Sequence, residues 1–172
     1  MTIEASILAR LHVTQSGGND FGGPQFAPKM EALLQFVDGV VLGQADLAWF
    51  DQRAVATAAN DDIDLAGVLS DVFGATLTFA ELVALFVINA PRAGAANTTA
   101  LTIGGGTNPA VGFLGGTAPT IGPIQPGGFL MLGAGHASGI GTVVAGTGDI
   151  LRVANAAGAT ANYQIGVIGR SA

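Results

Sequence analysis

The uninterrupted apolar run at residues 82–88, LVALFVI, constrains the fold of this chain more than any other feature. It shows no alternation of polar and apolar residues, and it combines β-branched with aromatic side chains before it ends at Asn89. A short run of this kind predicts a central β-strand with both faces buried. A helix is the alternative, because Ala80 and Glu81, which lead into the run, are good helix formers.

Alternating segments separated by turn signals fill the chain from residue 61 to its end. Residues 98–103 and 161–168 alternate as half-buried strands do, and glycine-rich turns at residues 104–108 and 126–128 lie between such segments. A spacing of about 8–12 residues between turns is typical of an all-β sandwich, jelly roll or barrel. We therefore expect a mainly β fold with an antiparallel β-sandwich or jelly-roll body.

Residues 1–60 differ from the rest of the chain. Residues 6–14 predict either a first strand or an arm that pairs with a neighbouring molecule. Residues 15–29 hold four glycines and two prolines without periodicity, which predicts a long loop, and residues 30–38 fit a short helix or a strand. We expect an N-terminal arm and loop region with short elements at residues 1–60 and the β-sandwich body at residues 61–172. One continuous domain is the alternative.

Two phenylalanines stand out in the Gly/Pro-rich segment, because aromatic residues in such a segment often anchor it to another surface. One interpretation is that Phe21 and Phe26 pack on the protein's own core. The other is that they dock onto a partner subunit, with Pro24 and Pro28 in the same contact. These four residues are the interface candidates.

An aromatic pair at Trp49 and Phe50 lies close to two aspartates, Asp46 and Asp51. Because Trp49 is the only tryptophan of the chain, the simplest interpretation is that this pair anchors the core.

The composition predicts that the protein works inside an assembly. Only 10% of the residues are charged, against about 25% in typical domains, so much of the surface is left to apolar and small polar groups. Exposed apolar patches normally mark interfaces, and we expect a homo-oligomer, a dimer or a trimer. The net charge of −6 comes without any Lys/Arg cluster, which argues against nucleic-acid binding. No window approaches 18 apolar residues, so no membrane span is expected.

No catalytic or metal-binding constellation is found in the sequence. Cysteine is absent and only His12 and His136 are present, which leaves no basis for a Cys/His metal site. The acids at residues 61–71 do not match a calcium loop and are expected to be solvated. Glycine runs lack the phosphate-loop patterns, and Ser138 lacks a base and an orienting acid. We expect no enzymatic activity, no cofactor and no metal.

Several segments of the C-terminal two thirds, taken in order, resemble small virion proteins of tailed bacteriophages. The segments are DIDL (62–65), LSDVFG (69–74), LTFAELVALFVIN (77–89), LTIGG (101–105), IQPGG (124–128), TGDILRVAN (147–155) and YQIGVIG (163–169). The resemblance covers roughly residues 61–172 and implies a phage structural protein with a β-sandwich or jelly-roll body. It carries over no catalytic or ligand-binding residues.

The resemblance and the composition together lead to a functional expectation. The leading hypothesis is a capsid cement or decoration protein on the surface of the virion, which binds the major capsid protein and stabilises the shell. One alternative is a tail or host-attachment component with the same body. Another is a carbohydrate-binding module, which needs an exposed aromatic platform. Trp49 and Tyr163, the only Trp and Tyr, argue against that module.

Overall fold

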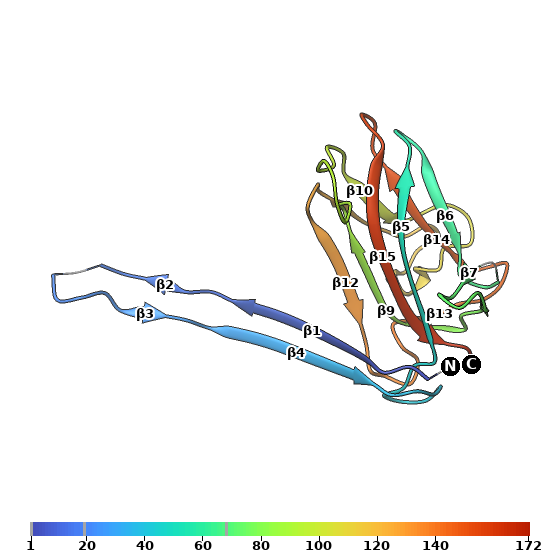
Figure 1. Ribbon diagram of the computed structural model, residues 1–172, viewed down its shortest axis with the longest axis horizontal. Coiled ribbons are helices and arrows are strands. Elements are labelled where there is room, and N and C mark those ends of the chain that lie inside the picture. The colour runs from blue at the N-terminus through green and yellow to red at the C-terminus, as the bar shows by residue number, and fades with distance from the viewer. Residues whose placement is uncertain (1, 19, 68) are drawn as a thin grey trace.

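The computed structural model describes residues 2–18, 20–67 and 69–172, which form a β-sandwich and a long two-stranded arm that leaves it at one end (Figure 1). The arm consists of β1 (Ala5–His12), β2 (Gln15–Ser16), β3 (Gln25–Phe26) and β4 (Lys29–Phe36). One sheet of the body has the order β12 (Phe129–Gly133), β9 (Glu81–Ile88), β15 (Ala161–Arg170) and β5 (Leu47–Val55), with β13 (Gly141–Thr142) also pairing β9. The other sheet has the order β11 (Thr120–Ile124), β10 (Leu101–Gly104), β14 (Ile150–Asn155) and β6 (Asn60–Asp64). A small hairpin of β7 (Leu69–Ser70) and β8 (Thr76–Leu77) and the 3-10 helix η1 (Gly112–Leu114) complete the described elements.

The expected antiparallel β-sandwich is confirmed. The long body strands pair in a nested way: β5 with β15, β6 with β14, β9 with β12, and β10 with β11. Because β5 pairs with β15 along its length, the body already begins at residue 47. The expected boundary at residue 60 therefore cuts through the five-stranded sheet. The sequence did not reveal that β5 belongs to the body, because polar residues on both faces of β5 hide the alternation expected of a strand.

The core lies between the two sheets. Leu85 and Val167 from one sheet meet Ile103, Leu151 and Val153 from the other, and all five side chains are fully buried. Full burial of a side chain of this size is worth about 1.5–3 kcal/mol. These inward positions follow from the alternation along each strand, which puts every second side chain between the sheets.

The run at residues 82–88 forms the central strand β9, as expected, between β12 and β15. The prediction that both its faces are buried is wrong at Phe86, whose side chain is 39% exposed on the outer face of the sheet. A β-bulge places Ile168 opposite Ala84 and Gly169 opposite Leu82, which leaves an extra residue in β9. The bulge shifts the alternation, so that buried residues are consecutive near its position.

The N-terminal segment is more regular than the sequence predicts. Of residues 30–38, residues 30–36 adopt the strand alternative, as part of β4, and the last two lie beyond its end. The segment expected as a long loop contains the paired strands β2 and β3. The pairs Leu11↔Met30 and Gln15↔Phe26 keep one register, so the ladder of β1 and β4 continues into β2 and β3. Backbone pairing carries the hairpin through a stretch whose side chains have no periodicity, and this is why the pattern was missed.

Candidate interaction surface

The arm is an amphipathic ribbon. Residues directly opposite one another in an antiparallel pair share a face, so the printed register separates two faces of β1 and β4. One face, the apolar face of the arm, consists of the pairs Ala5↔Phe36, Ile7↔Leu34, Ala9↔Ala32 and Leu11↔Met30. The opposite face consists of Ser6↔Gln35, Leu8↔Leu33, Arg10↔Glu31 and His12↔Lys29. All charged residues of the two strands therefore lie on the second face.

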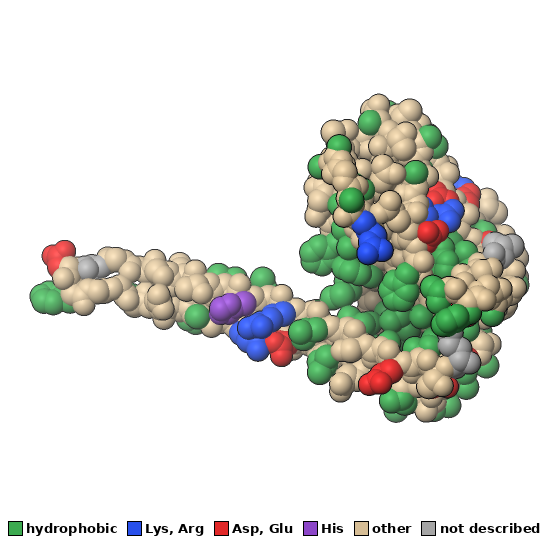
Figure 2. Space-filling model, in the orientation of Figure 1, with side chains coloured by type: hydrophobic (Ala, Val, Ile, Leu, Met, Phe, Trp, Pro, Cys, Tyr) green, Lys and Arg blue, Asp and Glu red, His purple; other side chains and the backbone are tan. Residues whose placement is uncertain are grey.

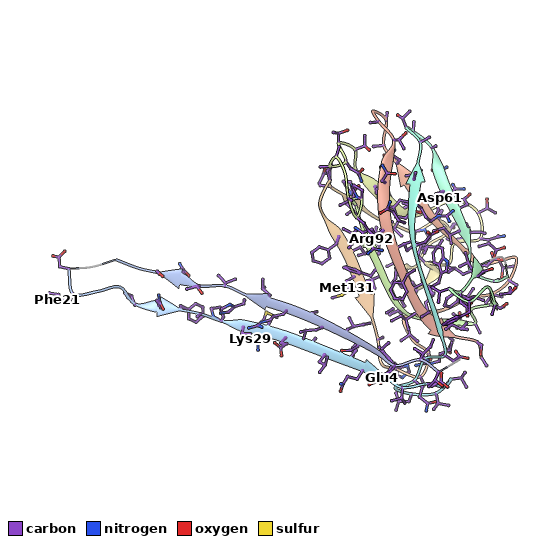
Figure 3. All side chains as sticks on the ribbon, viewed as in Figure 1. Glu4, Phe21, Lys29, Asp61, Arg92 and Met131 are labelled. Atoms are coloured by element: carbon purple, nitrogen blue, oxygen red, sulfur yellow. The ribbon has the colours of Figure 1, made fainter. Side chains whose placement is uncertain are left out.

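The base of the arm is fastened to the body through its apolar face. Phe36 is fully buried in a second hydrophobic cluster with Ala84 and Ile168, against which Ile7 and Leu34 pack. This cluster lies on the outer face of the five-stranded sheet. Because of it, the arm has a defined direction relative to the body where it starts (Figure 3).

Beyond its base the same apolar face continues without cover from the body. Leu11 is 59% exposed and Met30 is 71% exposed. The continuing register places Phe26 on this face as well. A two-stranded hairpin is marginally stable in water on its own, and this one exposes its apolar side. Such a segment is typical of an arm that gains its stability from a neighbouring molecule.

The outer face of the five-stranded sheet carries parallel rows of side chains, which the strand register defines. The row nearest the arm base is Ala48, Ile168, Ala84 and Gly133. The next row, here called the aromatic row, is Phe50, Gly166, Phe86 and Met131. The arm covers the first row and leaves the aromatic row open.

The aromatic row has a defined shape. The ring of Phe50 lies against Gly166, where a Cβ would come within 2.7 Å of the ring. Phe86 makes an edge-to-face contact with Phe129 of the following row, with ring centroids 5.9 Å apart. Phe50 and Phe129 are each 65% exposed. Figure 2 shows hydrophobic side chains gathered where the body faces the arm.

The arm and the sheet together enclose an apolar wedge. A cavity of about 650 Å³ lies between Leu11 and Met30 of the arm and Phe86, Phe129 and Met131 of the sheet. A deeper cavity of about 290 Å³ continues to the base of the arm, and the side chains of the first row and the aromatic row line it. In the wedge, exposed apolar groups of the arm and of the sheet face each other.

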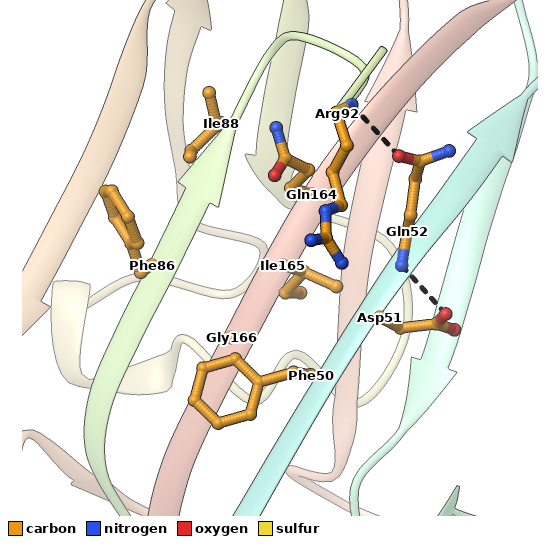
Figure 4. A pocket seen from close by; sticks show the side chains of 9 residues that line it. All are labelled: Phe50, Asp51, Gln52, Phe86, Ile88, Arg92, Gln164, Ile165 and Gly166. Atoms are coloured by element: carbon orange, nitrogen blue, oxygen red, sulfur yellow. Dashed lines mark hydrogen bonds between the residues drawn. The ribbon is translucent and has the colours of Figure 1, made fainter. Parts of the chain in front are cut away.

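A more polar pocket of about 520 Å³ continues the same sheet face away from the arm (Figure 4). Phe50 and Phe86 form one end, and Gln52, Gln164 and Arg92 form the other. The backbone N–H of Arg92 donates to Oε1 of Gln52 at 2.9 Å, which fixes the loop after β9. Within the described part of the chain, Arg92 forms no salt bridge, so this polar pocket, which lies outside the wedge, carries one unpaired cation.

A hydrogen-bonded network closes the sandwich where β5 and β6 lie at the same edge. Arg53 donates to both carboxylate oxygens of Asp61, at 2.7 and 2.8 Å, and the Tyr163 hydroxyl donates to Asp61 at 2.7 Å. Burial raises the pKa of Tyr163, and its bond to Asp61 raises it further. For Asp61, burial alone would raise the pKa, but the bonds from Arg53 and Tyr163 outweigh it and hold the pKa below its ordinary value of 3.8. The hydrogen bond to Asp61 raises the pKa of Arg53.

We expect this network to make the protein acid-sensitive. A carboxylate whose pKa is lower in the folded than in the unfolded state stabilises the fold fully above about pH 4, and the contribution disappears as the pH falls through the folded pKa. The free energy of unfolding, measured by urea titration between pH 6 and pH 2.5, should therefore fall below pH 4. Asp61→Asn should flatten that fall, and Tyr163→Phe should reduce it. An unchanged acid profile in Asp61→Asn would contradict the role given to this carboxylate.

The four interface candidates all lie in the distal part of the arm, away from the core. Phe21 is fully exposed at the tip (Figure 3), and Phe26 is 66% exposed. Pro24 and Pro28 accept backbone hydrogen bonds across the hairpin, from Gly17 at 2.9 Å and from Val13 at 3.2 Å. Packing of the phenylalanines on the protein's own core is therefore wrong, and docking onto a partner stays a prediction.

Sequence reasoning missed the residues that shape the wedge. Trp49 is buried in the core as expected, but Phe50, its neighbour, points to the opposite face of β5 and is exposed. A strand places consecutive side chains on opposite faces, so the pair could not anchor one core together. The alternation of residues 6–14 was the available signal for the arm. The composition of its two faces becomes clear only from the pairing of β4 with β1.

The remaining polar candidates have structural partners. Asp62 forms a bidentate salt bridge with Arg152 on the surface, in which Nε and Nη2 of the guanidinium donate to the two carboxylate oxygens at 2.6 and 2.7 Å. Nδ1 of the exposed His136 accepts a hydrogen bond from the Ser138 backbone. Across the described ranges, no group of three or more His, Cys, Asp or Glu side chains is arranged to hold a metal ion.

Comparison with known proteins leaves this chain without a match among family models, curated proteins or solved structures. In the part that the structure describes, no helix is long and apolar enough to cross a membrane.

Proposed function

We propose that the protein is a capsid decoration protein of a tailed bacteriophage, which binds the outer surface of the major capsid shell and stabilises it. The observation that carries the proposal is the arm, a hairpin anchored to the body at one end and exposing a continuous apolar face. An exposed ribbon of this kind suits a subunit that reaches over to a neighbour in an assembly.

Two further observations support the proposal. The nested strand pairing of the body supports a jelly-roll interpretation, and jelly rolls occur in viral capsid proteins as well as in lectins and cupins. The segments of residues 61–172 that resemble phage virion proteins support the same function. The low charge of the chain fits a protein whose surface is largely covered by partners.

The test is the number of copies in purified virions, measured by quantitative mass spectrometry against the major capsid protein. A decoration protein should be present in hundreds of copies, and capsids that lack it should disrupt at a lower temperature. A few copies per particle and unchanged heads would assign the protein to the tail instead. Absence from virions would overturn both assignments.

Shortening the arm should separate attachment from folding. Replacing residues 13–28 with Asn-Gly joins His12 to Lys29 through a two-residue turn and keeps the β1–β4 ladder. Because the body is not touched, its unfolding transition should stay within the error of the wild type. Binding to undecorated capsids, measured by co-sedimentation, should weaken by about tenfold or more. Binding at wild-type strength would show that the distal arm does not dock on the shell.

A further inference from the structure

We propose that a second copy of this chain occupies the wedge, so that the apolar face of the arm and the aromatic row are covered in a homo-oligomer before any shell is bound. This inference is independent of the capsid assignment, because it concerns the purified protein alone. It assigns an occupant to the surface between Leu11 and Met30 on one side and Phe86, Phe129 and Met131 on the other.

The chain itself shows that its two apolar surfaces fit each other. At the arm base, a Cβ at Gly133 would lie 3.2 Å from Leu34 Cδ1 and 3.6 Å from Ile7 Cδ1, so the glycine allows the ribbon to approach the sheet closely. Ala84 of the same row is small as well. The apolar face of the arm thus already packs on the outer face of the five-stranded sheet. A second copy offers the uncovered parts of the same two surfaces, the distal apolar face of its arm and the aromatic row of its sheet.

The charge distribution favours a neutral, apolar occupant. On the polar face of the arm, the Lys29 ammonium lies 2.7 Å from the Glu31 carboxylate, and Arg10 lies 3.7 Å from the same carboxylate. The apolar face and the aromatic row contain no charged residue. Arg10 and Glu31 also line the cavity, but they pair with each other, so the charge beside the wedge is compensated within the arm. The uncovered apolar surfaces therefore favour an apolar partner, such as another copy of this chain.

The available area is at the low end of what a specific contact needs. Four strands about 4.8 Å apart and two open rows about 7 Å apart span roughly 270 Å² of sheet, and the uncovered arm face adds about 150–200 Å². Two copies that cover these surfaces in each other bury about 840–940 Å², which is above most crystal-packing contacts and at the low end for a specific protein interface. In a two-fold symmetric dimer the same contact occurs twice: the arm of each copy packs on the sheet of the other.

The test uses paired charge substitutions that leave the net charge unchanged. Leu11→Lys with Met30→Glu places an ion pair on the apolar face, and Ser16→Lys with Gln25→Glu places the same pair on the opposite face of the ribbon. Sedimentation equilibrium of the wild type at micromolar concentration should show a dimer or a larger oligomer. The first variant should raise the dissociation constant about 100-fold, and the control should stay within about threefold.

The sheet side is tested separately. Phe129→Lys should weaken self-association, and mixing it with the Leu11→Lys/Met30→Glu variant should restore part of it, because one intact arm then meets one intact sheet. Circular dichroism and the unfolding midpoint identify any variant that has lost its fold, and Phe86→Lys replaces Phe129→Lys if needed. A monomeric wild type at about 100 μM would overturn the inference.

The outcomes also separate this inference from the proposed function. An oligomer that is absent from virions supports the inference and overturns the capsid assignment. A monomer that decorates capsids assigns the wedge to the shell and overturns the inference. Equal loss of association in the apolar-face variant and in its opposite-face control would also overturn it, because the effect would then not depend on the apolar face.

Discussion

Replacement of Arg170 by methionine is expected to lower the free energy of unfolding by about 3–5 kcal/mol, the range for removing one partner of a buried ion pair. The Arg170 side chain is fully buried, and its Nη1 lies 2.7 Å from the Glu81 carboxylate. The same guanidinium donates to the backbone carbonyls of Gln44, His136 and Ala137. Methionine would leave these acceptors and a carboxylate without their donor.

The expected loss is large because one side chain joins segments that are distant in sequence. Arg170 ties the end of β15 to β9, to the segment after the arm and to the loop after β12. Urea unfolding monitored by far-UV circular dichroism measures the effect. The matched control is Arg152→Met, which breaks the surface pair with Asp62 and should change stability little.

A second substitution at the same site makes the prediction sharper. Adding Glu81→Gln to Arg170→Met removes the unpaired carboxylate and should recover part of the lost stability, because a neutral amide costs less to bury than a charge. A loss of less than about 1 kcal/mol in Arg170→Met would mean that water or rearrangement replaces these bonds.

Truncation of Leu85 to alanine is expected to cost about 2–5 kcal/mol, because it removes buried methyl groups and leaves a cavity between the sheets. Leu85 is fully buried in the main core, on the inward face of the central strand β9. The matched control is Leu11→Ala, which removes the same atoms from a side chain that is 59% exposed on the arm. Its effect on unfolding of the body should stay within about 0.5 kcal/mol.

The two leucine variants also test whether the body and the distal arm contribute differently to the stability of the fold. Differential scanning calorimetry should show a lower midpoint for Leu85→Ala and an unchanged midpoint for Leu11→Ala in conditions where the protein is dissociated. Similar losses in both variants would mean that the distal arm contributes to the core, contrary to its exposure.

Local patterns in the sequence determined the class of the fold. Alternation at residues 161–168 indicated a strand, since a period of two fits an extended chain. The apolar run at residues 82–88 favoured a buried strand over the helical alternative, and the structure confirms the strand. Glycine-rich turns between such segments allowed antiparallel connections. These features predicted a mainly β fold of the sandwich, jelly-roll or barrel type, and the structure shows the antiparallel sandwich with β9 as a central strand.

Only the tertiary structure decided which faces are covered. Alternation shows that a strand has two faces, but the partner strand and its register decide which side chains join on each face. Met30 meets Leu11 because β4 pairs with β1, and Phe86 stays open because the arm covers the sheet only up to Ala84. The hairpin at residues 15–29 depends on backbone pairing that no side-chain period records. The wedge, and with it the candidate interaction surface, therefore arises from contacts between segments that the sequence reveals only separately.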